Sequence, residues 1–241
     1  MIDLHSHLLF GVDDGAQTLE ESLALARHAV ADGIRVSVLT PHVHPGRYEN
    51  SRKSLLPHVG AFQSALDAAA IPLQVRLGAE VRIGLESLEL LADDDVPFLG
   101  EVGGYRVMLL EFPHQTIPVG SQQFIERLLQ WKIRPLIAHP ERNKAIMAQP
   151  ERLLPFLELG CWLQVTAGSI VGRFGDASRA VALQLLKNGW VHVIATDAHN
   201  LRHRPPDLRE GVDAAAAIIG EAAAWRMVTE RPAEILGVKL T

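Results

Sequence analysis

The chain has 241 residues, of which 48% are hydrophobic and 21% are charged. A chain of this length and composition can bury a large core, which excludes a disordered tail, a collagen-like fibre and a small disulfide scaffold. The net charge of −5 argues against a nucleic-acid binder, and the single cysteine, Cys161, excludes an intrachain disulfide and a zinc site made of cysteines alone.

Short runs rich in Val, Ile and Leu alternate along the chain with longer amphipathic segments. The short runs predict buried parallel strands, because each is apolar at successive positions. In chain order they are Ile2–Leu4, Val36–Thr40, Val75–Glu80, Tyr105–Glu111, Arg134–Ala138, Trp162–Val165 and Val191–Ala195. We expect the segments between them to be helical.

Two of these helices have recognisable ends. In the first, apolar residues fall three or four positions apart, at Leu19, Leu23, Ala26 and Val30. Thr18 and Glu21 predict a capping box at its start, and Gly33 predicts its end. A later alanine-rich helix is expected to begin at Asp207, directly after two prolines.

The seven strand–helix alternations favour one α/β barrel domain over residues 1–241. The alternative is an open doubly wound sheet, which normally carries a glycine-rich phosphate-binding turn after its first strand. Here that turn reads His5-Ser6-His7. No apolar run reaches 18 residues and no signal-peptide pattern is visible, so we expect a cytoplasmic protein without membrane insertion.

Imidazole or carboxylate groups follow six of the seven predicted strands. In a barrel the carboxyl ends of the strands meet at one mouth, so these groups should gather there. The candidates for metal ligands are His5, His7, Asp14, His42, Glu80, Glu111, His139, Asp197 and His199. The pairs His5-x-His7 and Asp197-x-His199 share a spacing that points both side chains to the same side of an extended segment. Asp13 competes with Asp14, and the sequence does not decide between them.

The nine candidates comprise five imidazoles and four carboxylates, and no thiolate. Nine ligands are too many for one tetrahedral ion and suit two or three divalent ions. Glu80 and Glu111 end apolar runs, where a desolvated carboxylate needs a partner such as a metal. Mixed nitrogen and oxygen ligands are compatible with Mn, Fe or Zn. Such a cluster would keep excess positive charge and favour an anionic substrate.

Arginines near these ligands are candidates for binding that anion. Arg142 and Arg204 each closely follow a candidate ligand, and a guanidinium matches phosphate oxygens in a bidentate way. Arg47 and Arg52 are weaker candidates that could line the approach of the substrate. Cys161 is an unsuitable nucleophile for a cysteine-dependent phosphatase, because the residue six positions later is alanine and not arginine.

Together these residues resemble a known group, the PHP (polymerase and histidinol phosphatase) superfamily. More narrowly, the chain resembles the bacterial metal-dependent protein-tyrosine phosphatases of capsule and exopolysaccharide loci. The segments that carry the resemblance are Asp3–His7, Val12–Gly15, Thr40–His42, Gly78–Glu80, Leu110–Glu111, Ala138–Arg142 and Thr196–Asn200. Gly11 departs from the pattern, because an acidic residue is common there, and the segment 43–45 is also unlike it.

The resemblance implies a distorted (β/α)7 TIM-like barrel with a site for three divalent ions, of which Mn²⁺ is favoured and Fe or Zn are alternatives. It also implies that all nine ligand positions are filled and that Arg142 and Arg204 hold phosphate. The implied reaction is hydrolysis of phosphotyrosine by a metal-activated hydroxide. The implied partner is the tyrosine-rich tail of a bacterial tyrosine autokinase that controls polysaccharide export.

Three other functions remain open at this point. The first is a small-molecule phosphatase of the same superfamily, for example one that acts on histidinol phosphate. The second is an amidohydrolase-type deaminase, which also begins with a His-x-His pair. The third is a non-catalytic binding module stabilised by metal, although a degenerate relative should have lost ligands.

Overall fold

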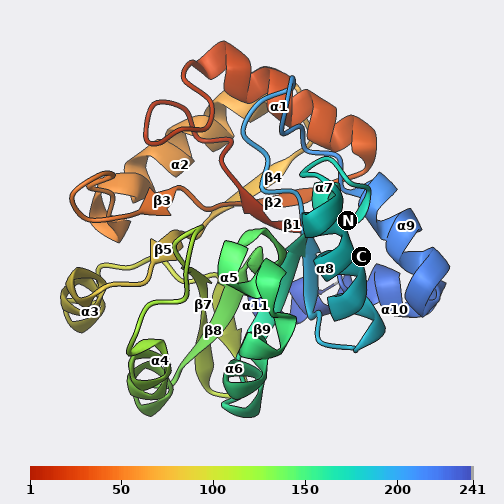
Figure 1. The fold of residues 1–241 in the computed structure, drawn as a ribbon. Coiled ribbons are helices and arrows are strands. Elements are labelled where there is room, and N and C mark those ends of the chain that lie inside the picture. The colour runs from red at the N-terminus through yellow and green to blue at the C-terminus, as the bar shows by residue number, and fades with distance from the viewer. Residues whose placement is uncertain (240–241) are drawn as a thin grey trace.

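The computed structural model describes residues 1–239, in which parallel strands lie at the centre and helices around them (Figure 1). The strands are β1 (Ile2–Ser6), β2 (Val36–Leu39), β3 (His42–Val43), β4 (Gln74–Leu77), β5 (Glu80–Arg82), β6 (Gly100–Val102), β7 (Tyr105–Glu111), β8 (Ile133–Ala138), β9 (Trp162–Thr166) and β10 (Val193–Ala195). The longer helices are α1 (Leu19–Asp32), α2 (Arg52–Ala68), α3 (Leu85–Ala92), α4 (Ser121–Gln130), α8 (Asp176–Lys187) and α9 (Arg209–Ile219). The shorter ones are α5 (Lys144–Ala148), α6 (Leu154–Glu158), α7 (Ala167–Ile170), α10 (Glu221–Arg226) and α11 (Glu230–Leu236), with 3₁₀ turns at Pro140–Arg142 and Pro150–Leu153.

The predicted α/β barrel is confirmed in a distorted form. One sheet has the order β1-β2-β4 and the other has the order β10-β9-β8-β7-β5-β3, with all of these pairs parallel. The two sheets meet on one side because β2 continues into β3 and β4 continues into β5. On the other side a parallel bridge joins Ser6, at the end of β1, to Ala198 after β10. The carboxyl ends of the strands therefore surround a common mouth.

One predicted strand is wrong in its extent. The run Val75–Glu80 is expected as a single strand, but it divides into β4 and β5 at Gly78 and Ala79. Gly78 packs so closely that a Cβ atom there would lie 2.8 Å from Val38 Cγ1. Glu80 consequently begins β5 and pairs across to His42 of β3, where the sequence prediction has it end a strand.

The two predicted helix ends are partly right. Gly33 ends α1 in the left-handed conformation, and the Thr18 side chain accepts a hydrogen bond from the Glu21 backbone. The capping box is incomplete, because the Glu21 carboxylate accepts from the backbone of Gln17 instead. The alanine-rich helix α9 begins at Arg209, two residues later than predicted, because Asp32 accepts hydrogen bonds from the backbone N–H groups of Leu208 and Arg209.

Apolar side chains fill the space inside the barrel and around it, whereas buried polar side chains gather at its mouth. Leu4, Leu109 and Leu136 are fully buried in a cluster of apolar side chains from β1, β7 and β8. A larger apolar cluster lies between the strands and the surrounding helices. Within residues 1–239, no helix combines the length and the apolar character that crossing a bilayer requires.

Candidate metal centre

The residues predicted as metal ligands come together at the mouth of the barrel. Their donor atoms form three overlapping groups, which are His5 with His7, Glu80 and Asp197; His7 with Asp14, His42 and His199; and His42 with Glu80 and Glu111. His139, the ninth candidate, lies beside them with its Nε2 atom 2.7 Å from Glu80 Oε1. Because Glu80 belongs to two of the groups, its carboxylate could bind two adjacent ions.

The first group has the dimensions of a single metal site. His5 Nε2 lies 3.2 Å from His7 Nε2, 3.3 Å from Glu80 Oε2 and 3.2 Å from Asp197 Oδ1. His7 Nε2 lies 3.3 and 3.4 Å from the same two oxygens. Four ligands at about 2.1 Å from a tetrahedral ion lie about 3.4 Å from one another, so these atoms could bind one cation with little movement.

The second and third groups lie on either side of His42, which follows β2. His42 Nε2 lies 3.3 Å from Asp14 Oδ1, and the same oxygen is 3.6 Å from His199 Nε2. His42 Nδ1 lies 3.0 Å from Glu80 Oε2. The two nitrogens of one imidazole therefore face different carboxylates, and His42 could bind an ion through either of them.

The protonation pattern of the two barrel histidines favours a cation between them. His5 Nδ1 donates a hydrogen bond to Gln164 Oε1, and His7 Nδ1 donates one to Asp13 Oδ2. With Nδ1 used as a donor in this way, each ring can offer the lone pair of Nε2, which faces the other ring, to a cation. A metal ion bound between the two Nε2 atoms would accept both lone pairs, and it would take the place of a proton there.

Buried polar atoms at the mouth lack partners. Glu80 Oε2, Asp197 Oδ1 and His199 Nε2 are buried and accept or donate no hydrogen bond within residues 1–239. An unpaired buried carboxylate oxygen is costly, and a coordinated cation removes that cost. The donor set, which contains nitrogen and oxygen but no sulfur, fits ions such as Mn²⁺, Fe²⁺ or Zn²⁺. The residues present therefore fit a divalent metal.

The pKa values of the cluster reflect crowded carboxylates. Burial alone would lower the pKa of His5, but Glu80 and Asp197 outweigh it and raise that pKa to about 10. Burial and the charge of Glu80 raise the pKa of Glu111 to about 7. A proton on His5 thus takes the place that a cation would hold, because the site attracts positive charge.

The structure distinguishes Asp13 from Asp14. The Asp13 carboxylate accepts hydrogen bonds from His7 Nδ1 and from the backbone N–H groups of Gly15 and His42, so it orients a proposed ligand. Asp14 places Oδ1 among the imidazoles of the second group. This geometry favours Asp14 as the ligand and Asp13 as the residue that orients the His7 imidazole. Gly15 is required for the close approach, since a Cβ atom there would lie 2.2 Å from the carbonyl oxygen of His7.

Sequence reasoning missed several supporting residues. No imidazole or carboxylate follows the sixth predicted strand, Trp162–Val165, yet Gln164 within it accepts a hydrogen bond from His5 Nδ1. A glutamine between two apolar residues, Leu163 and Val165, was the available indication. Arg82 was also missed, and its guanidinium donates to Glu111 Oε2 at 2.6 Å.

Two proposed ligands have strained backbone conformations. His139 has φ of 31° and Asp197 has φ of 53°, in the left-handed region that side chains other than glycine rarely adopt. They follow β8 and β10, where the chain turns away from the barrel. Such strain persists only where surrounding contacts hold it, and it concentrates at functional sites.

Both predicted phosphate-binding arginines lie at the same mouth. Arg142 and Arg204 donate to the same oxygen of Asp197, Oδ2, while Asp197 Oδ1 faces the histidines. The buried Nε of Arg204 has no hydrogen-bond partner within residues 1–239. Arg142 also stacks on the ring of Phe174 at 4.4 Å. Asp197 thus holds two guanidinium groups beside the metal cluster, with donors left over for an anion.

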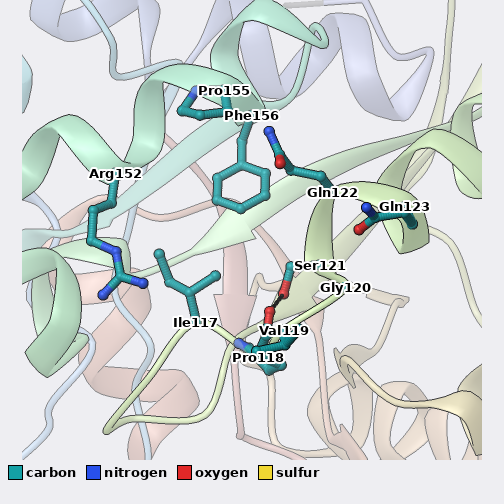
Figure 2. Close-up of a pocket in the computed structure, with 10 residues that line it drawn as sticks. All are labelled: Ile117, Pro118, Val119, Gly120, Ser121, Gln122, Gln123, Arg152, Pro155 and Phe156. Atoms are coloured by element: carbon teal, nitrogen blue, oxygen red, sulfur yellow. Dashed lines mark hydrogen bonds between the residues drawn. The ribbon is translucent and has the colours of Figure 1, made fainter.

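A cleft of about 240 Å³ opens over this cluster. Besides proposed ligands and both arginines, its lining includes His44, Arg47, Tyr48, Arg82 and His114. A separate cavity of about 350 Å³ lies between the loop before α4 and the segment 152–156, where Arg152 is its only titratable side chain (Figure 2). The chemistry therefore belongs to the smaller cleft.

Comparison with known families and proteins agrees with this geometry. A family model described as "Capsular polysaccharide synthesis, CpsB/CapC" matches residues 1–237. The chain belongs to the CpsB/CapC family. This membership confirms the resemblance to the phosphatases of capsule loci.

Members of the CpsB/CapC family are similar to the chain over most of their length. The tyrosine-protein phosphatase YwqE of Bacillus subtilis is 36% identical over 204 residues, covering 85% of this chain and 79% of the relative. The tyrosine-protein phosphatase CpsB of Streptococcus agalactiae is 31% identical over 241 residues, covering 98% of each chain. A crystal structure from work on YwqE of B. subtilis and CpsB of Streptococcus pneumoniae, described there as unique metal-dependent tyrosine phosphatases, matches with a TM-score of 0.91 at 31% identity, covering 100% of this chain and 96% of that one.

More distant structures share only the fold. The organophosphorus hydrolase of Deinococcus radiodurans matches with a TM-score of 0.62 at 17% identity, covering 98% of this chain and 92% of that one. The barrel is thus an arrangement that other hydrolases share with the CpsB/CapC family.

Cys161 does not belong to the site. It is buried before β9 in the apolar core, and burial raises the pKa of its thiol to about 12. A thiol is not a nucleophile at neutral pH, so we expect a Cys161→Ser variant to keep its phosphatase activity within about twofold. Steady-state assays of both proteins with an aryl phosphate would check this. A loss of 100-fold or more in a folded variant would indicate cysteine chemistry.

Proposed function

We propose that this chain is a metal-dependent protein-tyrosine phosphatase that hydrolyses phosphotyrosine and acts in capsular or exopolysaccharide synthesis. The observation that carries the proposal is the buried cluster of imidazoles and carboxylates, with two arginines beside it, in a chain of the CpsB/CapC family. Relatives named as tyrosine-protein phosphatases, aligned over most of both chains, support the substrate class.

The residues of the mouth would divide the chemistry between them. His5, His7, Asp14, His42, Glu80, Glu111, His139, Asp197 and His199 would hold the ions, which we propose to be three in number, Mn²⁺ being favoured. Bound divalent ions would supply an activated water and neutralise charge on the phosphoryl oxygens. The donor set and the groups that share ligands support more than one ion.

Arg142 and Arg204 would bind the phosphoryl oxygens. Both guanidinium groups are held by Asp197, so they are already oriented before substrate enters. As the P–O bond breaks, negative charge spreads over the equatorial oxygens, and fixed cationic donors stabilise it without rearrangement. This role is electrostatic and leaves no covalent phosphoenzyme.

The leaving group explains why no dedicated acid is needed. A tyrosine phenol has a pKa of about 10, which makes its phenolate far easier to expel than the alkoxide of serine. His114, which lines the cleft, is a weak proton donor at neutral pH, because burial and the nearby Arg142 lower its pKa. The site is therefore better suited to aryl than to alkyl phosphates.

We further propose that the physiological substrate is a tyrosine-rich segment of a bacterial tyrosine kinase. The support is the description of the family by capsular polysaccharide synthesis, together with the phosphatase names of its members. A small-molecule phosphatase such as one acting on histidinol phosphate is the alternative that the cluster alone would also allow.

The test is a comparison of substrates by the metal-loaded protein. We expect kcat/KM for a phosphotyrosyl peptide to exceed that for the matched phosphoseryl peptide, and that for histidinol phosphate, by at least about 100-fold each, since a lower leaving-group pKa favours aryl esters. Release of inorganic phosphate would be measured for all three. Preferred turnover of histidinol phosphate would contradict the proposal and support the small-molecule alternative.

A further inference from the structure

The arginines that line the cleft differ in their partners. Four arginines line it, of which Arg82 binds Glu111, and Arg142 and Arg204 bind Asp197. Arg47 forms no ion pair with any of residues 1–239, although acidic residues outnumber basic ones in the whole chain by 28 to 23. The rim of the cleft therefore presents one guanidinium without a paired carboxylate, since Glu49 on the same segment accepts from the backbone N–H of Gly46 instead.

The segment that carries Arg47 is a tight hairpin at the edge of the cleft. His44 and Tyr48 exchange backbone hydrogen bonds of 3.1 and 2.8 Å, and Gly46 takes a φ of 83° at the turn. The Asn50 side chain donates to the carbonyl oxygens of Val12 and His42, at 2.9 Å each, and so fixes the end of the hairpin to the site. Arg47 is therefore held in place by its backbone.

Aromatic stacking links Arg47 to the metal cluster. Its guanidinium lies over the Tyr48 ring at 5.0 Å from the ring centre, and Tyr48 stacks on His42 with 5.4 Å between ring centres and 10° between planes. These contacts orient an exposed cation over the cleft. About three residues of extended peptide, at about 3.4 Å per residue, would span the distance from the proposed ligand His42 to the Arg47 guanidinium.

We propose that Arg47 is a specificity-determining residue that binds a carboxylate side chain of the substrate, one to three residues from the phosphotyrosine. The inference rests on the proposed function and names its substrate class as acidic phosphotyrosyl segments. Two other arginines already serve the phosphate, and a guanidinium pairs with a carboxylate through two parallel hydrogen bonds. A rim charge of this kind acts on the capture of the substrate and on its orientation.

The test compares two phosphotyrosyl peptides that differ only in flanking residues, one with aspartates and one with lysines. We expect the wild-type protein to favour the acidic peptide, and Arg47→Gln to reduce the ratio of the two kcat/KM values by roughly fivefold, chiefly through KM. Arg47→Glu should reverse the preference. If Arg47 acted only structurally, through Tyr48 and His42, its replacement would change kcat/KM for both peptides by the same factor. The ratio of the two values within each variant cancels such a common change.

Arg52 provides the matched control. It was also a candidate for lining the approach, but it lies on α2 away from the cleft and pairs with Asp94. An Arg52→Gln variant should leave the ratio unchanged. Equal losses for both peptides in Arg47→Gln, or a wild-type protein that does not distinguish them, would overturn this inference while leaving the phosphatase intact. Failure of the wild-type protein to cleave either peptide would instead contradict the proposed function.

Discussion

Exhaustive chelation of the purified protein should lower its turnover of a phosphotyrosyl peptide by at least about 100-fold. The reason lies in the arrangement of His5, His7, Glu80 and Asp197: the two Nε2 atoms lie within 3.4 Å of each other and of an oxygen of each carboxylate, in a buried site. These four side chains are imidazoles and carboxylates that lie next to one another, and none of them forms a pair of nucleophile and adjacent base. Chelation would therefore remove the ions that we expect to activate the attacking water.

The measurement should combine activity with metal content and thermal stability. Stripped protein would be analysed for bound metal and then reloaded with Mn²⁺, Fe²⁺ or Zn²⁺ in separate samples. We expect activity to return with at least one ion and the Tm to rise on loading, because an ion that binds only the folded chain stabilises it. Undiminished turnover in protein shown to be free of metal would exclude the proposed chemistry.

Much of the candidate site could be predicted from sequence, because in a parallel barrel the residues that follow each strand all lie at the same mouth. His5 and His7 follow the first strand and Asp197 and His199 follow the last, and the bridge between Ser6 and Ala198 makes these segments neighbours. Strand ends alone were enough to place them at one mouth. The apolar runs that define those strands are also the most readable feature of the sequence.

Other features depend on contacts between distant residues, which no local pattern encodes. The division of β4 from β5 follows from the packing of Gly78 against Val38, and the late start of α9 follows from capping by Asp32. The choice between Asp13 and Asp14 likewise depends on which carboxylate reaches His7 Nδ1. Adjacent residues with identical chemistry can be distinguished only once the loop that carries them is folded.

A Glu80→Gln variant should lose at least about 100-fold in kcat/KM and bind less metal. Glu80 is 1% exposed and belongs to two of the three ligand groups, with Oε1 near His139 and Oε2 near His5, His7 and His42. Glutamine keeps the shape of the side chain but removes the negative charge and replaces one oxygen by an NH₂ group that cannot bind a cation. The loss should therefore exceed that expected for a ligand that touches one ion.

Glu89, an exposed residue on the nearby helix α3, supplies a control with the same chemical change. Glu89→Gln should match the wild-type protein in activity and metal content. For Glu80→Gln, circular dichroism would establish that the chain is folded, and the assay would be repeated at increasing Mn²⁺. If excess metal restored full kcat, Glu80 would serve only to retain an ion; a persistent loss of kcat at saturation would mean that its charge also positions the ions for reaction. A folded variant within tenfold of wild type without added metal would remove Glu80 from the site.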